Sequence, residues 1–306
     1  MKINLIVASA TTLLASSAFA ADKTEFDAIT LSTSLGWLGG ESGEYVYADD
    51  GSKTSALTWK IKNAPIIKGD LSWDATHWLT LGARGWVTLT SSDSQMDDYD
   101  WLTPGQSGWS DWSTHPDTQL NHANEFDAYV KGWLVKTPEY GLAAMLGYQQ
   151  TRYSWTAYGG TYRYDNGQDV GAFVPGEAVG GYKQQFSVPY LGLAGVSRFG
   201  DVELSAMFKF SPWVRARDND EHYQRAVTFH EKGINSDYYS ATLAAGYYLN
   251  PSAKIYMEFN YSQYKTASAD MTIIDRMMED QQHLSGDVAG LSNKSYSLTT
   301  GLQYQF

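Results

Sequence analysis

The chain has no cysteine among its 306 residues and only 8 prolines. Without cysteine, disulfide bridges and thiolate metal sites are excluded, so stability has to come from hydrogen bonds and packing. After the first twenty residues there is no run of eighteen apolar residues, which excludes a membrane-spanning helix. Basic residues are scarce as well: 22 Lys and Arg stand against 34 Asp and Glu, and this net charge of −12 argues against a nucleic-acid partner.

The amino terminus has the pattern of an export signal. A single cation, Lys2, precedes an apolar stretch from Leu5 to Leu14, and the small residues Ala18 and Ala20 flank Phe19. This pattern predicts a secretory signal peptide over residues 1–20 and a mature domain over residues 21–306. The mature part is rich in aromatic residues, with most of the chain's 22 Tyr and 11 Trp.

Several segments alternate strictly between apolar and polar residues. From Leu79 to Leu89 the odd positions are apolar or small, and the even positions include Thr80, Arg84 and Thr88. The same period of two is typical of β-strands with one apolar face. It recurs over residues 126–134, 202–210, 255–261 and 296–306, where the opposite face carries Asp127, Lys131, Glu203, Lys209, Lys254, Glu258 or Gln303. A polar barrel lumen accepts such residues, whereas the core of a soluble sandwich does not.

The connections between these segments are of two lengths. Short turns are expected at residues 73–77, 136–141, 198–201 and 249–253, and long loops at residues 36–53, 97–122, 157–181, 216–235 and 266–293. Four turns alternating with five loops predict ten strands with both termini on the short-turn side. The expected fold is therefore an all-β, ten-stranded antiparallel transmembrane barrel with long extracellular loops and short periplasmic turns. A soluble all-β protein with Gly-rich turns is the alternative.

Two clusters of acids follow alternating strands. In "QMDDYDW", Asp98 and Asp100 have the same parity as the inward residues of an apparently unbroken strand that begins at Trp78, so both should point into the barrel. The length of this strand places them above the apolar band, in the barrel mouth. In "DNDEHY", Asp220 and His222 also share a face, but the parity of residues 202–210 points them outward. We therefore predict a β-bulge between Phe210 and Asp218, with Pro212 as its marker. The clusters belong to strands three and seven, which nearly face each other.

These residues suit the activation of a water molecule. The motifs GxSxG and HExxH are absent, which leaves three carboxylates and one imidazole. Asp220 orients His222 as the general base, while Asp98 and Asp100 hold the water or bind the developing oxyanion. Hydrolysis of an amide bond is the expected reaction. Two alternatives are a non-catalytic adhesin or invasin and a structural or lipid-modifying barrel, although acids far above the lipid argue against the latter.

The chain resembles the omptin family of outer-membrane aspartic-type endopeptidases of Gram-negative bacteria. The similarity rests on "IIKGDLSWD", "DYDW", "HPDTQLNHANEFD", "KGWL", "GYKQQF", "PYLGL", "DNDEHY" and "AGYYLNPSAKIY", which run in order along the mature chain. The segments "TFHEK" and "GLSNKSYSLTTGLQYQF" are similar to its plasminogen-activator branch. The resemblance implies a protease, working as a monomer without a metal or other cofactor, whose active site faces the outside of the cell.

The resemblance also implies functions for individual residues. The catalytic set is Asp98, Asp100, Asp220 and His222; the acidic pocket for a basic residue before the cut is Glu44 and Asp218; and Asp111 and His115 line the groove beyond the cut. The substrates implied are basic peptides or proteins, with plasminogen and antimicrobial peptides as candidates.

The family further requires lipopolysaccharide as an activating lipid. Tyr148, Gln150 and Arg152 share the outward parity, so the Arg152 guanidinium can pair with a lipid phosphate. Two positions depart from the family pattern, because Gln150 stands where an acid is frequent and Gln185 where a basic residue is frequent. Lys183 and Lys232 are candidate substitutes, although parity does not decide which way Lys183 points.

Overall fold

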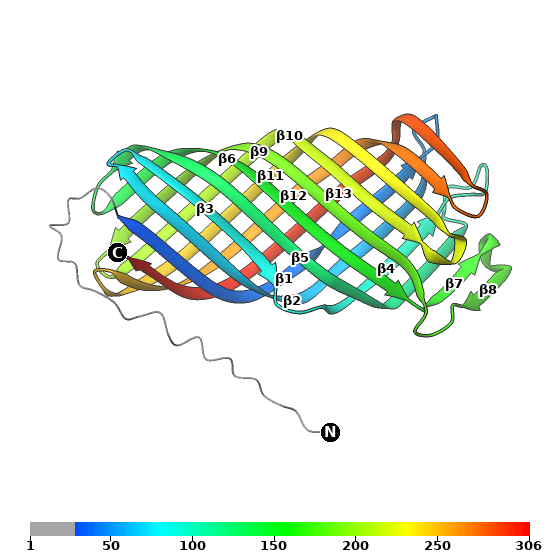
Figure 1. Cartoon of the computed structure of the whole chain (residues 1–306), viewed down its shortest axis with the longest axis horizontal. Coiled ribbons are helices and arrows are strands. Elements are labelled where there is room, and N and C mark those ends of the chain that lie inside the picture. Colours follow the sequence, from blue (N-terminus) through cyan, green and yellow to red (C-terminus); the bar gives the residue numbers. More distant parts are fainter. Residues whose placement is uncertain (1–27) are drawn as a thin grey trace, which may run out of the picture.

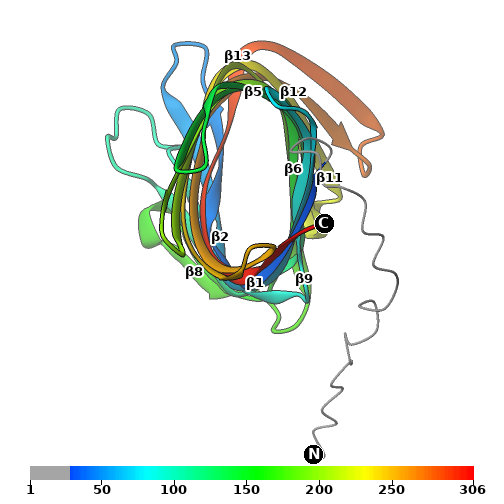
Figure 2. The same ribbon diagram turned by 90° about the vertical axis from the view of Figure 1, so that its left-hand side faces the viewer.

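The chain forms one closed antiparallel barrel. The structure, a computed structural model, describes residues 28–306, so the expected signal peptide, residues 1–20, and the first residues of the expected mature domain, 21–306, lie outside the described part. The strands run obliquely around one long axis (Figure 1), and the end-on view shows a closed ring with a flattened cross-section (Figure 2). None of the helical turns in the described part is long and apolar enough to cross a membrane.

The described residues contain long strands and two short 3-10 turns. The strands are β1 (Ile29–Tyr47), β2 (Lys53–Thr76), β3 (Leu79–Thr88), β4 (Ser92–Asp100), β5 (Asp111–Lys136), β6 (Tyr140–Tyr158), β7 (Thr161–Tyr164), β8 (Asp169–Ala172), β9 (Ala178–Phe199), β10 (Val202–His222), β11 (Val227–Asn250), β12 (Ala253–Asp275) and β13 (Asp280–Gln305). The 3-10 turns are η1 (Asp165–Gly167) and η2 (Tyr223–Arg225).

Ten strands complete the ring, as predicted. The segments β3 and β4 follow one another between β2 and β5 and act as the third strand of the ring, while β7 and β8 form a hairpin that extends from one end of the barrel. The ring closes where β1 pairs with β13, from Thr30 opposite Gln305 to Val46 opposite Ala289. The carboxyl terminus therefore lies beside the start of β1, as expected for an even number of strands.

The third strand is not continuous, which corrects the expectation of an unbroken strand from Trp78 to Asp98. The ladder stops at Thr88 and resumes at Ser92. On the neighbouring strand β2, Pro65 has no N–H to donate and Asn63 has a left-handed backbone with φ 48°. The inward parity nevertheless survives the break, because Thr88, Ser94 and Met96 are all buried inside the barrel.

The two ends of the barrel differ in the length of their connections. At the turn end the strands are joined by four short turns, close to the predicted positions, and the residues between the strands are 77–78, 137–139, 200–201 and 251–252. At the other end, here called the loop end, the regions predicted as long loops are mostly ordered strand. For example, β1 and β2 pair up to Tyr47 opposite Lys53, so the hairpin tip is short. Backbone pairing in these extensions satisfies polar groups that irregular loops would leave to solvent.

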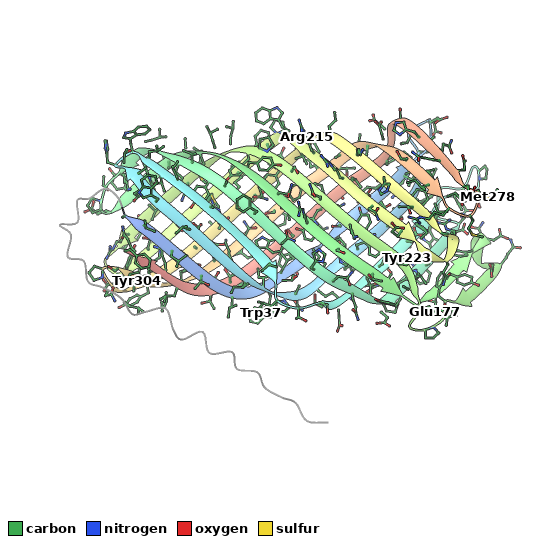
Figure 3. The ribbon with its side chains drawn as sticks, viewed as in Figure 1. Trp37, Glu177, Arg215, Tyr223, Met278 and Tyr304 are labelled. Atoms are coloured by element: carbon green, nitrogen blue, oxygen red, sulfur yellow. The ribbon has the colours of Figure 1, made fainter. Side chains whose placement is uncertain are left out.

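The outer wall and the interior have the polarity predicted from the alternation. Apolar side chains such as Phe126, Leu204 and Leu298 are exposed on the outside, and Trp37 projects from the wall in Figure 3. Inside, the fully buried Asp127 carboxylate accepts from Lys209 Nζ at 2.6 Å. Such a band of exposed apolar residues matches a lipid environment, and the paired charges fill the lumen.

Candidate active site

A cleft of about 390 Å³ opens at the loop end of the barrel. Its lining includes all four predicted catalytic residues, Asp98 and Asp100 from one wall and Asp220 and His222 from the other. The strands β4 and β10 belong to the third and seventh positions of the ring, as predicted. The structure thus brings together residues that are more than a hundred positions apart in the chain.

Asp98 and Asp100 reach the cleft because β4 keeps the inward phase of β3. The Ser55 hydroxyl on β2 donates to Asp98 Oδ1 at 3.5 Å. Burial raises the pKa of Asp98 well above its ordinary value, and the charges of Asp100 and Asp220 raise it further. Burial also raises the pKa of Asp100. Two carboxyl groups so close together favour a state in which one of them holds a proton.

Asp220 and His222 reach the cleft because β10 contains the predicted bulge. On the β9 side, Phe210 pairs with Leu191 and Arg215 with Ser187, so β10 has one residue more than its partner over this stretch. Inward-facing residues are accordingly odd-numbered up to Ser211 and even-numbered from Val214 onward. This shift turns both functional side chains inward, and His222 Nε2 lies 2.5 Å from Asp220 Oδ2.

The other nitrogen of the same imidazole also has a partner. Arg225, the last residue of η2, places its Nη2 against Nδ1 of His222. The guanidinium also lines the cleft, and its charge opposes the rise in the pKa of Asp98 and of Asp100. A cation thus lies between the two acidic walls.

The predicted groove residues Asp111 and His115 line the cleft on β5. The Ser110 hydroxyl donates to Asp111 Oδ2 at 2.6 Å, which orients that carboxylate. His115 is only 2% exposed, its Nδ1 lies 2.5 Å from the Gly159 carbonyl oxygen, and burial lowers its pKa. A neutral imidazole at this place can contact a substrate without adding charge.

The predicted pocket residues Glu44 and Asp218 also come together, in a separate cluster beside the cleft. Their carboxylate oxygens and that of Glu231 all lie within 4.8 Å of one another, and this is a set whose atoms could hold a cation. Glu44 is 2% and Glu231 0% exposed. Oxygen atoms of all three side chains are buried without a hydrogen-bond donor from the described residues.

The electrostatics of this cluster favour the binding of a cationic group. Burial and the charge of Asp220 raise the pKa of Asp218 to about 8. Burial, followed by the neighbouring carboxylates, also raises the pKa of Glu44 and of Glu231 well above their ordinary values. A guanidinium or ammonium group entering the cluster would relieve both the missing hydrogen bonds and the mutual repulsion.

Aromatic side chains form the floor of the cleft. Trp59, which lines it, stacks on Tyr182 with ring centroids 5.1 Å apart. Trp155 stacks on Tyr182 in turn and on Tyr153. Since all four rings are nearly inaccessible, they separate the cleft from the charged lumen below.

The sequence analysis missed Glu231 and Arg225. Inward positions on β11 are even-numbered from Ser236 to Ser240 but odd-numbered at Glu231 and Gly233. The parity of the membrane-spanning part, continued to Glu231, therefore predicts an outward side chain, whereas the structure has it inside. A compensating irregularity opposite the β10 bulge causes this shift. Arg225 lies in a turn, where alternation carries no information. The signal that was available for Glu231 was its place in the "TFHEK" segment.

The candidate lipid-binding residues lie on the outer wall. Tyr148, Gln150 and Arg152 face outward on β6, and Arg152 donates to Gln150 Oε1 at 2.6 Å and to Gln185 Oε1 at 3.1 Å. Lys183 and Lys232 are also exposed between buried neighbours, so both point outward. Parity left the direction of Lys183 open, and the structure decides it.

A transmembrane-type barrel with a cleft of carboxylates and an imidazole at its loop end is the architecture of an outer-membrane hydrolase. The sequence model of the Omptin family matches residues 25–306. The chain therefore belongs to the omptin family of outer-membrane proteases. It is 51% identical to the plasminogen activator of Yersinia pestis over the whole of both chains, and 44% identical to the outer membrane protease OmpP of Escherichia coli K12 over 91% of this chain and 90% of that one.

The fold is shared with a solved structure of the same family. The crystal structure of the outer membrane protease OmpT from Escherichia coli superposes with a TM-score of 0.88 at 43% identity and covers 93% of this chain and 99% of that one. The chain is therefore a β-barrel protease of the Gram-negative outer membrane, as the sequence resemblance implied.

Proposed function

We propose that this protease is an aspartic-type endopeptidase that cuts peptide bonds next to Arg or Lys at the cell surface. The observation that carries the proposal is the presence of two sites at the loop end. One is the cleft with Asp98, Asp100, Asp220 and His222, and the other is the buried cluster of three carboxylates beside it. The first set activates water and the second binds a basic side chain.

The reaction begins with a water molecule held between the two walls. Asp220 accepts the Nε2 proton of His222, which leaves Nδ1 as the base that takes a proton from water. The water oxygen forms a bond to the peptide carbonyl carbon, and the protonated member of the Asp98 and Asp100 pair donates to the resulting oxyanion. The C–N bond then breaks, and His222 gives its proton to the leaving amine nitrogen.

The basic side chain before the cut enters the cluster of Glu44, Asp218 and Glu231. A guanidinium has five N–H donors and matches several carboxylate oxygens at once, so arginine suits this cluster especially well. Asp111 and His115 contact the residues beyond the cut. The loop end faces the outside of the cell, where basic peptides, antimicrobial peptides or plasminogen are the substrates; the last follows from the name of the Yersinia relative.

The catalytic assignment is tested with variants of neighbouring residues. His222→Ala and Asp98→Asn should each lower kcat on an Arg-containing peptide by about 10² to 10⁴, the usual contribution of a positioned acid or base. Asp97→Asn is the matched control, because Asp97 is next to Asp98 in the chain but does not line the cleft and pairs with Lys60 at 3.1 Å. All variants should still migrate differently on denaturing gels before and after heating, as a folded β-barrel does. Full activity of His222→Ala would remove imidazole catalysis from the mechanism.

We also propose that lipopolysaccharide is the activating lipid and that its phosphates bind a row of outward residues. Arg152 on β6 lies opposite Gln185 on β9, Gln185 opposite Arg217 on β10, and Arg217 opposite Lys232 on β11. The row thus has cations on both sides of Gln185, which supports a phosphate site despite the glutamine. Tyr148 lies below Arg152, nearer the apolar band.

Lipid dependence is tested by assaying the refolded protein with and without lipopolysaccharide. Arg152→Ala and Arg217→Ala should each raise the lipopolysaccharide concentration needed for half-maximal activity. Lys62→Ala is the control, since Lys62 is an exposed cation on β2, on the opposite side of the ring from β10. If all three variants raise this concentration equally, the lipid responds to general surface charge, and the proposed phosphate site around Gln185 is wrong.

A further inference from the structure

The contact between Arg225 and His222 bears directly on the state of the catalytic base. A guanidinium is always charged and has only N–H donors, so His222 Nδ1 must be the acceptor in this contact. The proton of the neutral imidazole then resides on Nε2, which faces Asp220 Oδ2. With both nitrogens engaged, the imidazole has no lone pair left for a water molecule.

Arg225 also acts on the acids of the opposite wall through its positive charge. Its charge opposes the rise in the pKa of Asp98 and of Asp100, so it partly neutralises the site in the absence of substrate. The Arg225 side chain is exposed, and the turn η2 that carries it has no buried residue. The side chain can therefore leave without disturbing the core.

We propose that the Arg225 side chain is a movable latch: in the resting enzyme its guanidinium occupies Nδ1 of His222 and blocks access of water. The latch thereby selects for a second basic residue in the substrate. The inference rests on the proposed function, in which His222 is the base. A substrate must displace the guanidinium before water can reach Nδ1. A substrate with a basic residue after the cut restores a positive charge near Asp98 and Asp100, whereas a substrate with a neutral residue there does not. The latch therefore opposes the neutral substrate more strongly.

The kinetic test compares two peptides that differ only after the cut, Arg–Arg and Arg–Ala. In Arg225→Gln, kcat/KM for the Arg–Ala peptide should rise about three- to tenfold, the size of one modest hydrogen bond, while the Arg–Arg peptide changes by less than about twofold. Arg276→Gln is the matched control, because Arg276 lies at the same rim but pairs with Glu221 at 3.4 Å. A fall with both peptides in Arg225→Gln, or an equal gain in Arg276→Gln, overturns the latch.

A second measurement does not depend on activity. Nitrogen NMR of the imidazole, with the His222 signal assigned from its loss in His222→Ala, should show a hydrogen-bonded Nδ1 acceptor in the parent protein and a free one in Arg225→Gln. An unchanged Nδ1 signal means that the contact does not exist in solution and overturns the latch. Wild-type cleavage by His222→Ala would instead overturn the proposed mechanism, and the two failures are distinguished in this way.

Discussion

Glu44→Gln is the substitution that most directly tests the acidic pocket. It removes one negative charge and keeps the shape of the side chain, which is 2% exposed and has an Oε2 atom without a donor among the described residues. A hydrogen bond between charged groups contributes about 1.5–3 kcal/mol, which corresponds to about 10- to 100-fold in kcat/KM. Asp218 and Glu231 remain to hold the cation, so activity on arginine peptides should fall by this amount and not disappear.

The assay uses paired peptides in which arginine before the cut is replaced by citrulline, which has nearly the same shape but no charge. In Glu44→Gln, kcat/KM should fall for the arginine peptide because the charge pair is lost. For the citrulline peptide, kcat/KM should stay within about threefold of the parent value, because the neutral side chain makes no charge pair with Glu44. Glu41→Gln is the matched control on the same strand, since Glu41 points outward and pairs with Lys294 at 2.8 Å. Equal losses on both peptides would refute the pocket.

Unfolding does not provide an alternative explanation for a loss in Glu44→Gln. The pKa of Glu44 is raised in the folded protein, mainly by burial, so its carboxyl group favours the folded state less as pH rises above its unfolded pKa. Removing the ionisable group should therefore keep or increase stability at neutral and alkaline pH. Thermal unfolding in detergent checks this sign, and a lower midpoint at pH 8 would contradict it.

Three further outcomes are expected. For arginine peptides kcat/KM should rise with pH toward about 8 and then level off, because the pKa of Asp218 is raised to about 8 and only its charged form attracts the guanidinium, whereas citrulline peptides should not follow this profile. Lys209→Met should destabilise the barrel by about 3 kcal/mol by leaving the Asp127 carboxylate short of a partner, and adding Asp127→Asn should restore much of the loss in urea titrations. Gly301→Ala should lower the yield of heat-modifiable barrel, because a Cβ there would overlap the Thr33 carbonyl oxygen where β1 pairs with β13.

Alternation predicted the barrel because side-chain direction in a strand depends only on local geometry. Neighbouring residues such as Phe126 and Asp127 lie on opposite faces of the sheet once both belong to a strand, and the apolar one is then expected on the lipid side. The count of ten strands followed from turn spacing, and even the bulge after Phe210 could be inferred because parity and function disagreed there. The break between Thr88 and Ser92 was missed, since its cause lies in the partner strand at Asn63 and Pro65.

The sequence by itself determined the class of fold, the polarity of the two faces and the acids of the cleft, because each of these depends on residues near one another in the chain. Only the tertiary structure decided that Glu231 joins Glu44 and Asp218, and that Arg225 covers His222. Both depend on how far the strands shift at paired bulges and on where a turn folds back. Those shifts result from packing and hydrogen bonding across the closed ring, which a linear pattern does not contain.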